Sequence, residues 1–307
     1  MHSKPLLICV VGPTAIGKTA LAIKIACHFS AEIISADSRQ FYKEMNIGTA
    51  VPSPEELNAA KHHFIQNKSI FDSYSVGNFE KDAIILLKEL FENNYIVVMV
   101  GGSGLYVDAV VKGLDEFPKV SQELRNTLNK DLEEKGIVFL QEELKEKDPA
   151  YYQKVDLQNH HRIIRALEIC RSQSIPYSSF LKSENKTREF DTLFVGLQAD
   201  RQLVYSRINQ RVDIMIQEGL LEEAKDLLPH KNLNALQTVG YRELFDYFEG
   251  NTSKEEAIEE IKKNTRRFAK RQGTWFRKNE NIKWYNYTTE ASEIIKFIEN
   301  ELPKSNQ

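Results

Sequence analysis

A glycine-rich turn near the N-terminus constrains this chain more than any other feature. The run G-P-T-A-I-G-K-T at residues 12–19 fits the pattern G-x-x-x-x-G-K-[ST], follows an apolar run at 6–11 and precedes a helical pattern at 18–29. In such a phosphate-binding loop (P-loop), backbone N–H groups point at an anion, the lysine adds a positive charge and the Thr19 hydroxyl can bind Mg²⁺. The sequence therefore predicts a bound diphosphate or triphosphate with Mg²⁺. The predicted phosphate-binding residues are Gly12, Pro13, Thr14, Ala15, Ile16, Gly17, Lys18 and Thr19.

Strand and helix patterns alternate along much of the chain. Apolar runs typical of buried strands lie at 6–11, 32–35, 95–100 and 192–197. Helical patterns lie at 18–29, 79–93, 201–228 and 254–277, with Asn78 as the expected N-cap of the second. Buried strands that alternate with helices predict a parallel sheet covered on both faces. We therefore expect an α/β fold, a P-loop NTPase-like parallel sheet flanked by helices.

Residues 119–187 differ from the rest of the chain. Their pattern is helical and charged, with no convincing strand. We interpret them as an inserted all-helical domain, and residues 1–118 and 188–307 as a catalytic core that ends in basic helices.

The composition argues against a disulfide framework, a membrane span and a general attraction to nucleic acid. Cys9, Cys27 and Cys170 show no C-x-x-C spacing. No apolar run approaches the roughly 20 residues of a membrane helix, and the run before Gly12 is too short for a signal peptide. The formal net charge is −3, so a polyanion site depends on local clusters of Lys and Arg. We expect a soluble, cytoplasmic monomer with no membrane contact.

Two polar residues follow predicted strands, and the carboxyl ends of parallel strands open onto one crevice. Asp37 follows the run at 32–35, where its carboxylate suits either a base that takes a proton from an acceptor or a turn-former. Ser103 follows the run at 95–100, where it either donates to a phosphate oxygen or caps a helix. No acidic residue ends that second run, so the aspartate that holds Mg²⁺ in motor and switch ATPases is missing.

Two pairs of arginines have helical spacing. Arg207 and Arg211 are four apart, and they either clamp phosphate oxygens or pair with nearby acids. Arg162 and Arg165 share a helix face with His161 nearby, which is typical of a surface that contacts phosphates or bases.

Residues 262–278 form a strongly basic stretch. They contain eight Lys or Arg and no acid, interleaved with Phe268, Trp275 and Phe276. Such a helix either faces a polyanion or presents a solvated basic side. The tandem His62-His63 has no cluster of Cys or carboxylates around it, which argues against a metal site.

Together, these motifs resemble the tRNA dimethylallyltransferase family in its bacterial form. The matching pieces keep the family's order and span most of the chain. They are G-P-T-A-I-G-K-T-A-L-A at 12–22, I-I-S-A-D-S-R-Q-F-Y-K-E-M-N-I-G-T-A at 33–50, V-G-G-S-G-L-Y at 100–106, H-R-I-I-R-A-L-E at 161–168, V-G-Y-R at 239–242 and T-R-R-F-A-K-R-Q-G-T-W-F-R at 265–277. The family usually has Thr where this chain has Ser103, which keeps the hydroxyl, and often Pro where it has Lys61.

The resemblance implies an activity. Dimethylallyl diphosphate would occupy the P-loop, and its dimethylallyl group would pass to N6 of the adenosine at tRNA position 37, beside the anticodon, in tRNAs reading codons that begin with U. Asp37 would be the general base, while Lys18, Ser103, Arg211 and Mg²⁺ on Thr19 stabilise the departing diphosphate, with Arg207 nearby. The target base would be flipped out of the anticodon loop.

The resemblance also implies a set of tRNA contacts on the anticodon stem-loop. They fall on Asp37, Ser38, Arg39, Gln40, Ser103, Arg125, His161, Arg162, Ile163, Ile164, Arg165, Gln237, Thr238, Val239, Gly240, Tyr241 and Arg242, with Arg266, Lys270 and Arg271 on the basic helix.

Two other functions share parts of this pattern. A P-loop nucleoside or small-molecule kinase would have the same loop, base and arginine clamp, but it has no need of the basic aromatic helix at 262–278. A non-catalytic RNA-binding P-loop protein would keep that helix but would not need Asp37.

Overall fold

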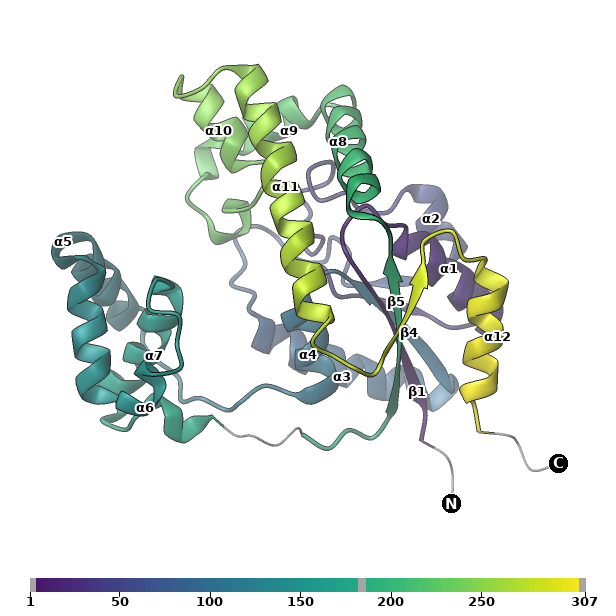
Figure 1. Cartoon of the computed structure of the whole chain (residues 1–307), viewed down its shortest axis with the longest axis horizontal. Coiled ribbons are helices and arrows are strands. Elements are labelled where there is room, and N and C mark those ends of the chain that lie inside the picture. Colours follow the sequence, from purple (N-terminus) through teal and green to yellow (C-terminus); the bar gives the residue numbers. More distant parts are fainter. Residues whose placement is uncertain (1–3, 182–185, 304–307) are drawn as a thin grey trace. The chain divides into compact units, whose positions relative to one another are not determined.

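One parallel sheet contains all the named strands in the part of the chain that the computed structural model describes, residues 4–181 and 186–303. The strands pair in the order β3-β2-β4-β1-β5-β6, and every pair is parallel (Figure 1). Their bounds are Leu6–Val11 (β1), Ile33–Ser35 (β2), His62–His63 (β3), Ile96–Gly101 (β4), Asp191–Gln198 (β5) and Ile282–Asn286 (β6). The predicted parallel sheet is confirmed.

The sheet carries helices on both faces because its central strands have apolar side chains at every position. Every residue of β1 and β4 is buried. Successive side chains of β1 point to opposite faces: Leu6, Ile8 and Val10 join a core that includes α1 and α12. Leu7, Cys9 and Val11 join a second core that includes α3 and α4.

The helices of the larger unit are α1 (Lys18–Phe29), α2 (Pro54–Ala59), α3 (Val76–Asn93), α4 (Gly104–Lys112), α8 (Arg201–Gln217), α9 (Leu220–Leu227), α10 (Arg242–Phe248), α11 (Lys254–Phe276) and α12 (Ala291–Glu301). Helices α1, α3, α8, α9 and α11 correspond to the predicted helical patterns with differences at their ends, whereas α2, α4, α10 and α12 were not predicted. The expectation that Asn78 caps α3 is wrong. Ser75 is the N-cap, and Asn78 is its partner three residues into the helix, since each side chain accepts the other's backbone N–H.

The predicted long helix at 201–228 is two helices. Gly219 has φ 103° and separates α8 from α9, because a left-handed residue ends the helical path. Helices α9 and α10, with the neighbouring ends of α8 and α11, lie beyond the carboxyl ends of the strands (Figure 1), where they share a core with Tyr42 and Met45 from the segment after β2.

A second compact unit comprises residues 113–187, and its first boundary falls after Lys112. It contains α5 (Gln122–Lys147), α6 (Pro149–Tyr152) and α7 (His160–Gln173), with no strand among its described residues. Positions 182–185, which belong to the predicted insertion, lie outside the described residues. The hydrophobic core of this smaller unit is separate from the cores of the larger unit and includes Leu128, Leu140 and Leu167.

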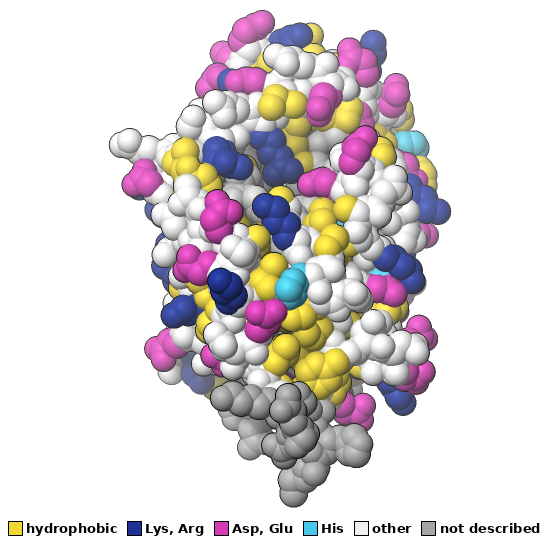
Figure 2. Space-filling model, turned by 90° about the vertical axis from the view of Figure 1, so that its right-hand side faces the viewer, with side chains coloured by type: hydrophobic (Ala, Val, Ile, Leu, Met, Phe, Trp, Pro, Cys, Tyr) yellow, Lys and Arg dark blue, Asp and Glu magenta, His cyan; other side chains and the backbone are white. Residues whose placement is uncertain are grey.

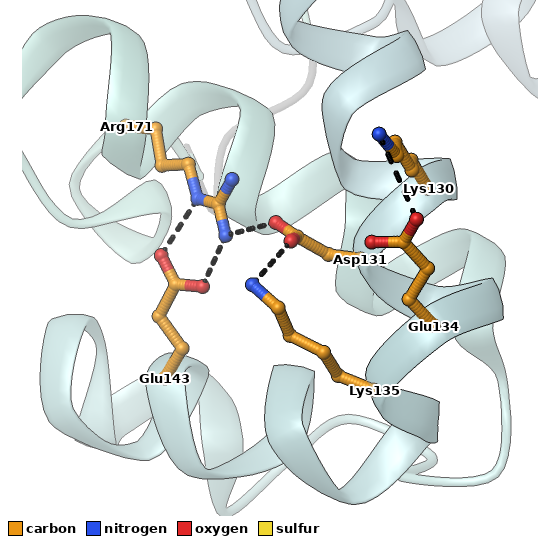
Figure 3. Close-up of polar contacts among 6 residues, drawn as sticks. All are labelled: Lys130, Asp131, Glu134, Lys135, Glu143 and Arg171. Atoms are coloured by element: carbon orange, nitrogen blue, oxygen red, sulfur yellow. Dashed lines mark hydrogen bonds and ion pairs between the residues drawn. The ribbon is translucent and has the colours of Figure 1, made fainter.

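Ion pairs connect α5 to α7 in this unit (Figure 3). Arg171 donates to Glu143 at 2.6 and 2.8 Å and to Asp131 at 2.9 Å, and Lys135 donates to Asp131 at 2.7 Å. Gly136, with φ 80°, breaks α5 between Asp131 and Glu143, so one arginine can bind carboxylates from both halves of that helix.

None of the helices in the described ranges is long and apolar enough to cross a membrane.

Candidate active site

The P-loop joins β1 to α1 and is shaped by its glycines. Gly12 has φ 144°, and a Cβ there would lie 2.5 Å from the carbonyl oxygen of Leu197 on β5. Gly17 has φ 101° and precedes α1, whose first turn has neither a capping side chain nor an acidic residue. The N–H groups at this helix N-terminus are therefore available to an anion.

Three cations, Lys18, Arg39 and Arg211, and one carboxylate share the pocket at this loop. Lys18, Thr19, Asp37 and Arg211 all line it. Burial lowers the pKa of Lys18 to about 8, with Asp37 acting in the opposite direction and Arg211 in the same direction. Burial also lowers the pKa of Arg211, again opposed by Asp37. Because the cations outnumber the carboxylate and are partly desolvated, the pocket favours a multiply charged anion.

The two predicted clamp arginines have different positions. Arg211 reaches the loop with its guanidinium 3.4 Å from the Thr14 hydroxyl. Arg207 donates through Nε to the carbonyl of Ala15 at 2.7 Å and lies over the ring of Tyr287. Arg207 therefore braces the loop backbone, and Arg211 is the arginine that lines the pocket containing Asp37.

The position of Asp37 is compatible with both roles expected from the sequence, a base and a turn-former. Its Oδ1 accepts the backbone N–H of Arg39 at 3.0 Å, which makes it a turn-former. Its carboxylate also lines the pocket with Lys18, as a base for an acceptor requires.

Ser103 contacts Ser38, the residue that follows this aspartate. Its hydroxyl accepts the backbone N–H of Ser38 at 3.2 Å and is 3.3 Å from the Ser38 hydroxyl. These contacts tie the turn after β4 to the turn after β2. Ser103 also occupies the N-cap position of α4, because its backbone carbonyl accepts the N–H of Val107 at 3.1 Å. Among the described residues its hydroxyl bonds to Ser38. Gly101 permits that approach, because a Cβ there would lie 2.3 Å from the carbonyl oxygen of Ala36.

Gln272 is a site residue that the sequence analysis did not single out. It lies on α11, is buried, and its Oε1 accepts the backbone N–H of Thr14 at 2.8 Å. A Cβ on Gly102 would lie 2.1 Å from its amide nitrogen. Its presence in the run at 265–277 was the only available signal, because the contact joins residues 258 positions apart.

The predicted acceptor residues of the larger unit gather at the same pocket. Ser38, Arg39, Gln40, Thr238, Val239 and Gly240 all line it. Arg39 also donates to the carbonyls of Asn234 and Ala235 at 2.9 and 3.0 Å. It therefore links the segment after β2 to the segment before α10. Gln237 and Arg242 are exposed.

The side chains of three predicted contacts are unavailable. Tyr241 is fully buried, and its hydroxyl donates to Glu223 at 2.7 Å. Ile163 and Ile164 lie in the core of the smaller unit. A tRNA contact at these three positions stays a prediction, and it would have to be made by the backbone because the side chains are buried.

In the smaller unit, a buried carboxylate holds two predicted RNA-binding arginines. Glu168 is 2% exposed and pairs with Arg165 at 2.9 Å and Arg125 at 3.1 Å. His161 and Arg162 are exposed on the same helix, α7. Glu168 orients the two guanidinium groups, a role that its place in the sequence did not reveal.

Helix α11 is basic, but part of its charge is paired. Lys262 contacts Asp213 and Glu259, and Arg266 donates to Asn209 at 2.7 Å. Lys270 and Arg271 are exposed and form no ion pair among the described residues. They are therefore the residues of α11 best suited to an external polyanion.

Positive charge on the molecule is local. In the face seen in Figure 2, Lys and Arg side chains are interspersed with Asp and Glu, while several of the dark blue side chains lie close together in its upper half. This agrees with the net charge of −3.

The described part of the chain contains no group of three or more His, Cys, Asp or Glu that could hold a metal ion. His62 and His63 form β3, where His63 contacts Glu32 at 2.6 Å and His62 contacts the carbonyl of Ala60 at 2.7 Å.

Comparisons with known proteins agree on one family. The family model described as IPP transferase matches residues 40–279. A tRNA dimethylallyltransferase of Flavobacterium johnsoniae is 59% identical over 97% of this chain and 99% of its own length. The tRNA isopentenylpyrophosphate transferase of Bacillus halodurans has a solved structure with a TM-score of 0.72 and 36% identity, covering 97% of this chain and 96% of that one. A eukaryotic dimethylallyltransferase, captured acting on tRNA, has a TM-score of 0.82 and 25% identity, covering 98% of this chain and 81% of that one.

Proposed function

Because the chain belongs to the IPP transferase family, we propose that it transfers a dimethylallyl group from dimethylallyl diphosphate to tRNA. The acceptor is N6 of the adenosine at tRNA position 37, on the 3′ side of the anticodon, in tRNAs that read codons beginning with U. The protein acts as a monomer in the cytoplasm. The observation that carries the proposal is the convergence of Lys18, Arg211 and Asp37 on one pocket at the P-loop.

The donor side of this pocket stabilises a leaving group. As the bond between the allylic carbon and the bridging oxygen breaks, negative charge grows on the diphosphate. Lys18, Arg211 and the N–H groups of the P-loop are already in place around that position, so they stabilise the charge without rearranging. Ser103 adds a hydroxyl that contacts Ser38, the residue after Asp37.

The acceptor side supplies a base. The exocyclic nitrogen of adenine is a weak nucleophile because its lone pair is delocalised into the ring, and it must lose a proton once the new C–N bond forms. The carboxylate of Asp37 accepts that proton. An adenosine in a folded anticodon loop has to be flipped out to reach a pocket of this kind.

A magnesium ion fits the residues of the P-loop. The Thr19 hydroxyl at the start of α1 would hold the ion together with the diphosphate, since the described residues offer no group of three or more His, Cys, Asp or Glu that could bind a metal. When bound, the ion offsets the charge of the departing diphosphate.

The remaining RNA contacts lie on basic surfaces. Lys270 and Arg271 on α11, with Arg266 beside them, bind backbone phosphates of the anticodon stem. In the smaller unit, Arg125, Arg165, His161 and Arg162 bind the same RNA.

One incubation tests this function. The chain is mixed with dimethylallyl diphosphate, Mg²⁺ and an unmodified tRNA whose anticodon is followed by two adenosines, and the RNA is digested and analysed by mass spectrometry. We expect one isopentenyl adduct on the adenosine next to the anticodon. Absence of the adduct, together with phosphorylation of a nucleoside by ATP, would identify a kinase instead.

A further inference from the structure

Glu223 on α9 holds the loop at residues 46–48 by its backbone. One carboxylate oxygen accepts the N–H groups of Asn46 and Ile47 at 3.0 and 2.8 Å, and the other accepts that of Gly48 at 2.9 Å. Three successive N–H groups that point inward form a nest for an anion. Here the protein supplies the anion itself.

The same carboxylate also binds a second segment. The oxygen that accepts from Gly48 accepts the hydroxyl of Tyr241 at 2.7 Å. Burial beside Glu223 raises the pKa of Tyr241, so the phenol keeps the proton that it donates. A Cβ on Gly48 would lie 2.6 Å from the Tyr241 hydroxyl, so the two segments approach as closely as glycine allows.

Both segments continue into walls of the active-site pocket. Gly48, Thr49 and Ala50 line the pocket, and the side chain of Gln40 donates to the carbonyls of Thr49 and Ala50 at 3.3 and 2.9 Å. Thr238 to Gly240, which immediately precede Tyr241, line it from the other segment. Glu223 therefore joins two stretches that line the pocket with Asp37. The first of them, at residues 46–50, also lines a neighbouring pocket with the P-loop.

We propose that Glu223 is a positioning residue that presets the acceptor side of the pocket. This inference rests on the proposed function in taking the acceptor to be tRNA. The donor side is built from the P-loop, Arg211 and Gln272, and none of these is hydrogen-bonded to Glu223 in the described chain. Loss of the Glu223 carboxylate should therefore weaken use of the acceptor and leave use of the donor intact.

The decisive variant is Glu223→Gln. An amide keeps one acceptor oxygen, so in either orientation two of the four donors face an N–H₂ group. The matched control is Glu222→Gln, which changes the charge of an exposed neighbour on α9. Tyr241→Phe removes a single donor and is a milder variant that keeps the aromatic ring in the core.

Three measurements are made on each variant of the full chain. With an anticodon stem-loop RNA, Glu223→Gln should raise the KM for RNA by about tenfold or more, the scale expected when partly buried donors lose their partner. The KM for dimethylallyl diphosphate should stay within about twofold. Amide hydrogen exchange at residues 46–48 should accelerate by about tenfold or more. Tyr241→Phe should change the same quantities less, and Glu222→Gln should change none.

Two results would overturn the proposal. One is an unchanged KM for RNA in Glu223→Gln, whatever the exchange rates. The other is a parallel weakening of both substrates, which would make Glu223 a general stabilising residue. If the wild-type chain forms no adduct, the proposed function fails first, and slow exchange at 46–48 that depends on Glu223 would still support the anchoring of this wall.

Discussion

Asp37 serves the backbone and the pocket at once. One oxygen accepts the N–H of Arg39, and no other hydrogen bond to this carboxylate is found among residues 4–181 and 186–303. The turn fixes the direction of the side chain, so the second oxygen can meet an acceptor without a search for the right rotamer.

We expect Asp37→Asn to separate binding from chemistry. The amide oxygen can still accept the N–H of Arg39, so the turn and the affinity for tRNA should change little. The base is lost, so the single-turnover rate should fall by at least ~10². Rapid-quench kinetics and a tRNA binding assay check this. Weak tRNA binding with an unchanged single-turnover rate would argue against the role of Asp37.

Individual residues were predictable from sequence when a local motif identified them. Lys18, Thr19 and Asp37 follow strands at fixed offsets, and the structure brings them to one pocket. Gln272 and Glu223 were not predictable in this way. Their partners lie 258 and 175 to 177 positions away, and nothing in a single sequence reports such a pairing.

Among the elements, α11 divides into two halves by its ion pairs. Lysines in its N-terminal half are paired with acids, and the basic side chains of its C-terminal half form no ion pair among the described residues. The C-terminal half contains Lys270 and Arg271. We expect the double variant Lys270→Ala with Arg271→Ala to weaken tRNA binding and to flatten its salt dependence by about one unit per lost phosphate contact. Fluorescence anisotropy over a range of salt concentrations measures the slope.

A double variant in the N-terminal half is the control for that measurement. Lys262→Ala with Lys263→Ala removes the same number of charges, but both lysines are bound to acids, so the slope should hardly change. An unchanged slope for the Lys270 and Arg271 variant would mean that this side of α11 faces only solvent.

The ion cluster of the smaller unit should respond to acid. The pKa of Asp131 is lowered, chiefly by the hydrogen bond from Lys135. Burial acts in the opposite direction, and Arg171 lowers the pKa further. A lowered pKa means that the unfolded chain takes up the proton first. The stabilisation is therefore complete above the ordinary pKa of about 3.9 and is lost as the pH falls through the lower pKa of the folded state.

We expect Asp131→Asn to remove about 2 kcal/mol of stability at neutral pH, the scale of a hydrogen bond to a charged group. Its unfolding temperature should also change less than the wild-type value between about pH 5 and pH 2.5. Thermal unfolding followed by circular dichroism measures both. The control Glu134→Gln breaks only the exposed pair with Lys130. An acid dependence that persists in Asp131→Asn would place its origin elsewhere.

The elements that sequence predicted well are those buried on both sides. The runs at β1 and β4 have apolar side chains throughout, and their bounds agree with prediction within a residue. Strand β6 escaped notice because it is short and only Ile282 and Tyr285 of its five residues are buried. Helix α12 follows it and was missed with it.

At the scale of the whole molecule, two units have separate hydrophobic cores. The donor contacts proposed above belong to the larger unit alone, while the RNA contacts belong to both. A ligand slows hydrogen exchange in the parts that it stabilises. Dimethylallyl diphosphate with Mg²⁺ should therefore slow exchange at residues 12–19 and 207–211 and leave 160–173 unchanged.

Anticodon stem-loop RNA should slow exchange in both units. Hydrogen exchange with mass spectrometry resolves the segments, and inorganic diphosphate is a control that should reproduce the effect of the donor. Protection of 160–173 by the donor alone would show that the two units respond as one.

The contact between Lys18 and Pro13 bears on how the donor enters and leaves. The ammonium group of Lys18 donates to the carbonyl of Pro13 at 2.8 Å. The cation that a diphosphate needs is therefore already hydrogen-bonded to the loop that will surround the diphosphate. Binding then becomes an exchange of one partner for another, with no loop to fold. When the reaction ends, the same carbonyl competes with the product for the lysine, which favours diphosphate release and the next turnover.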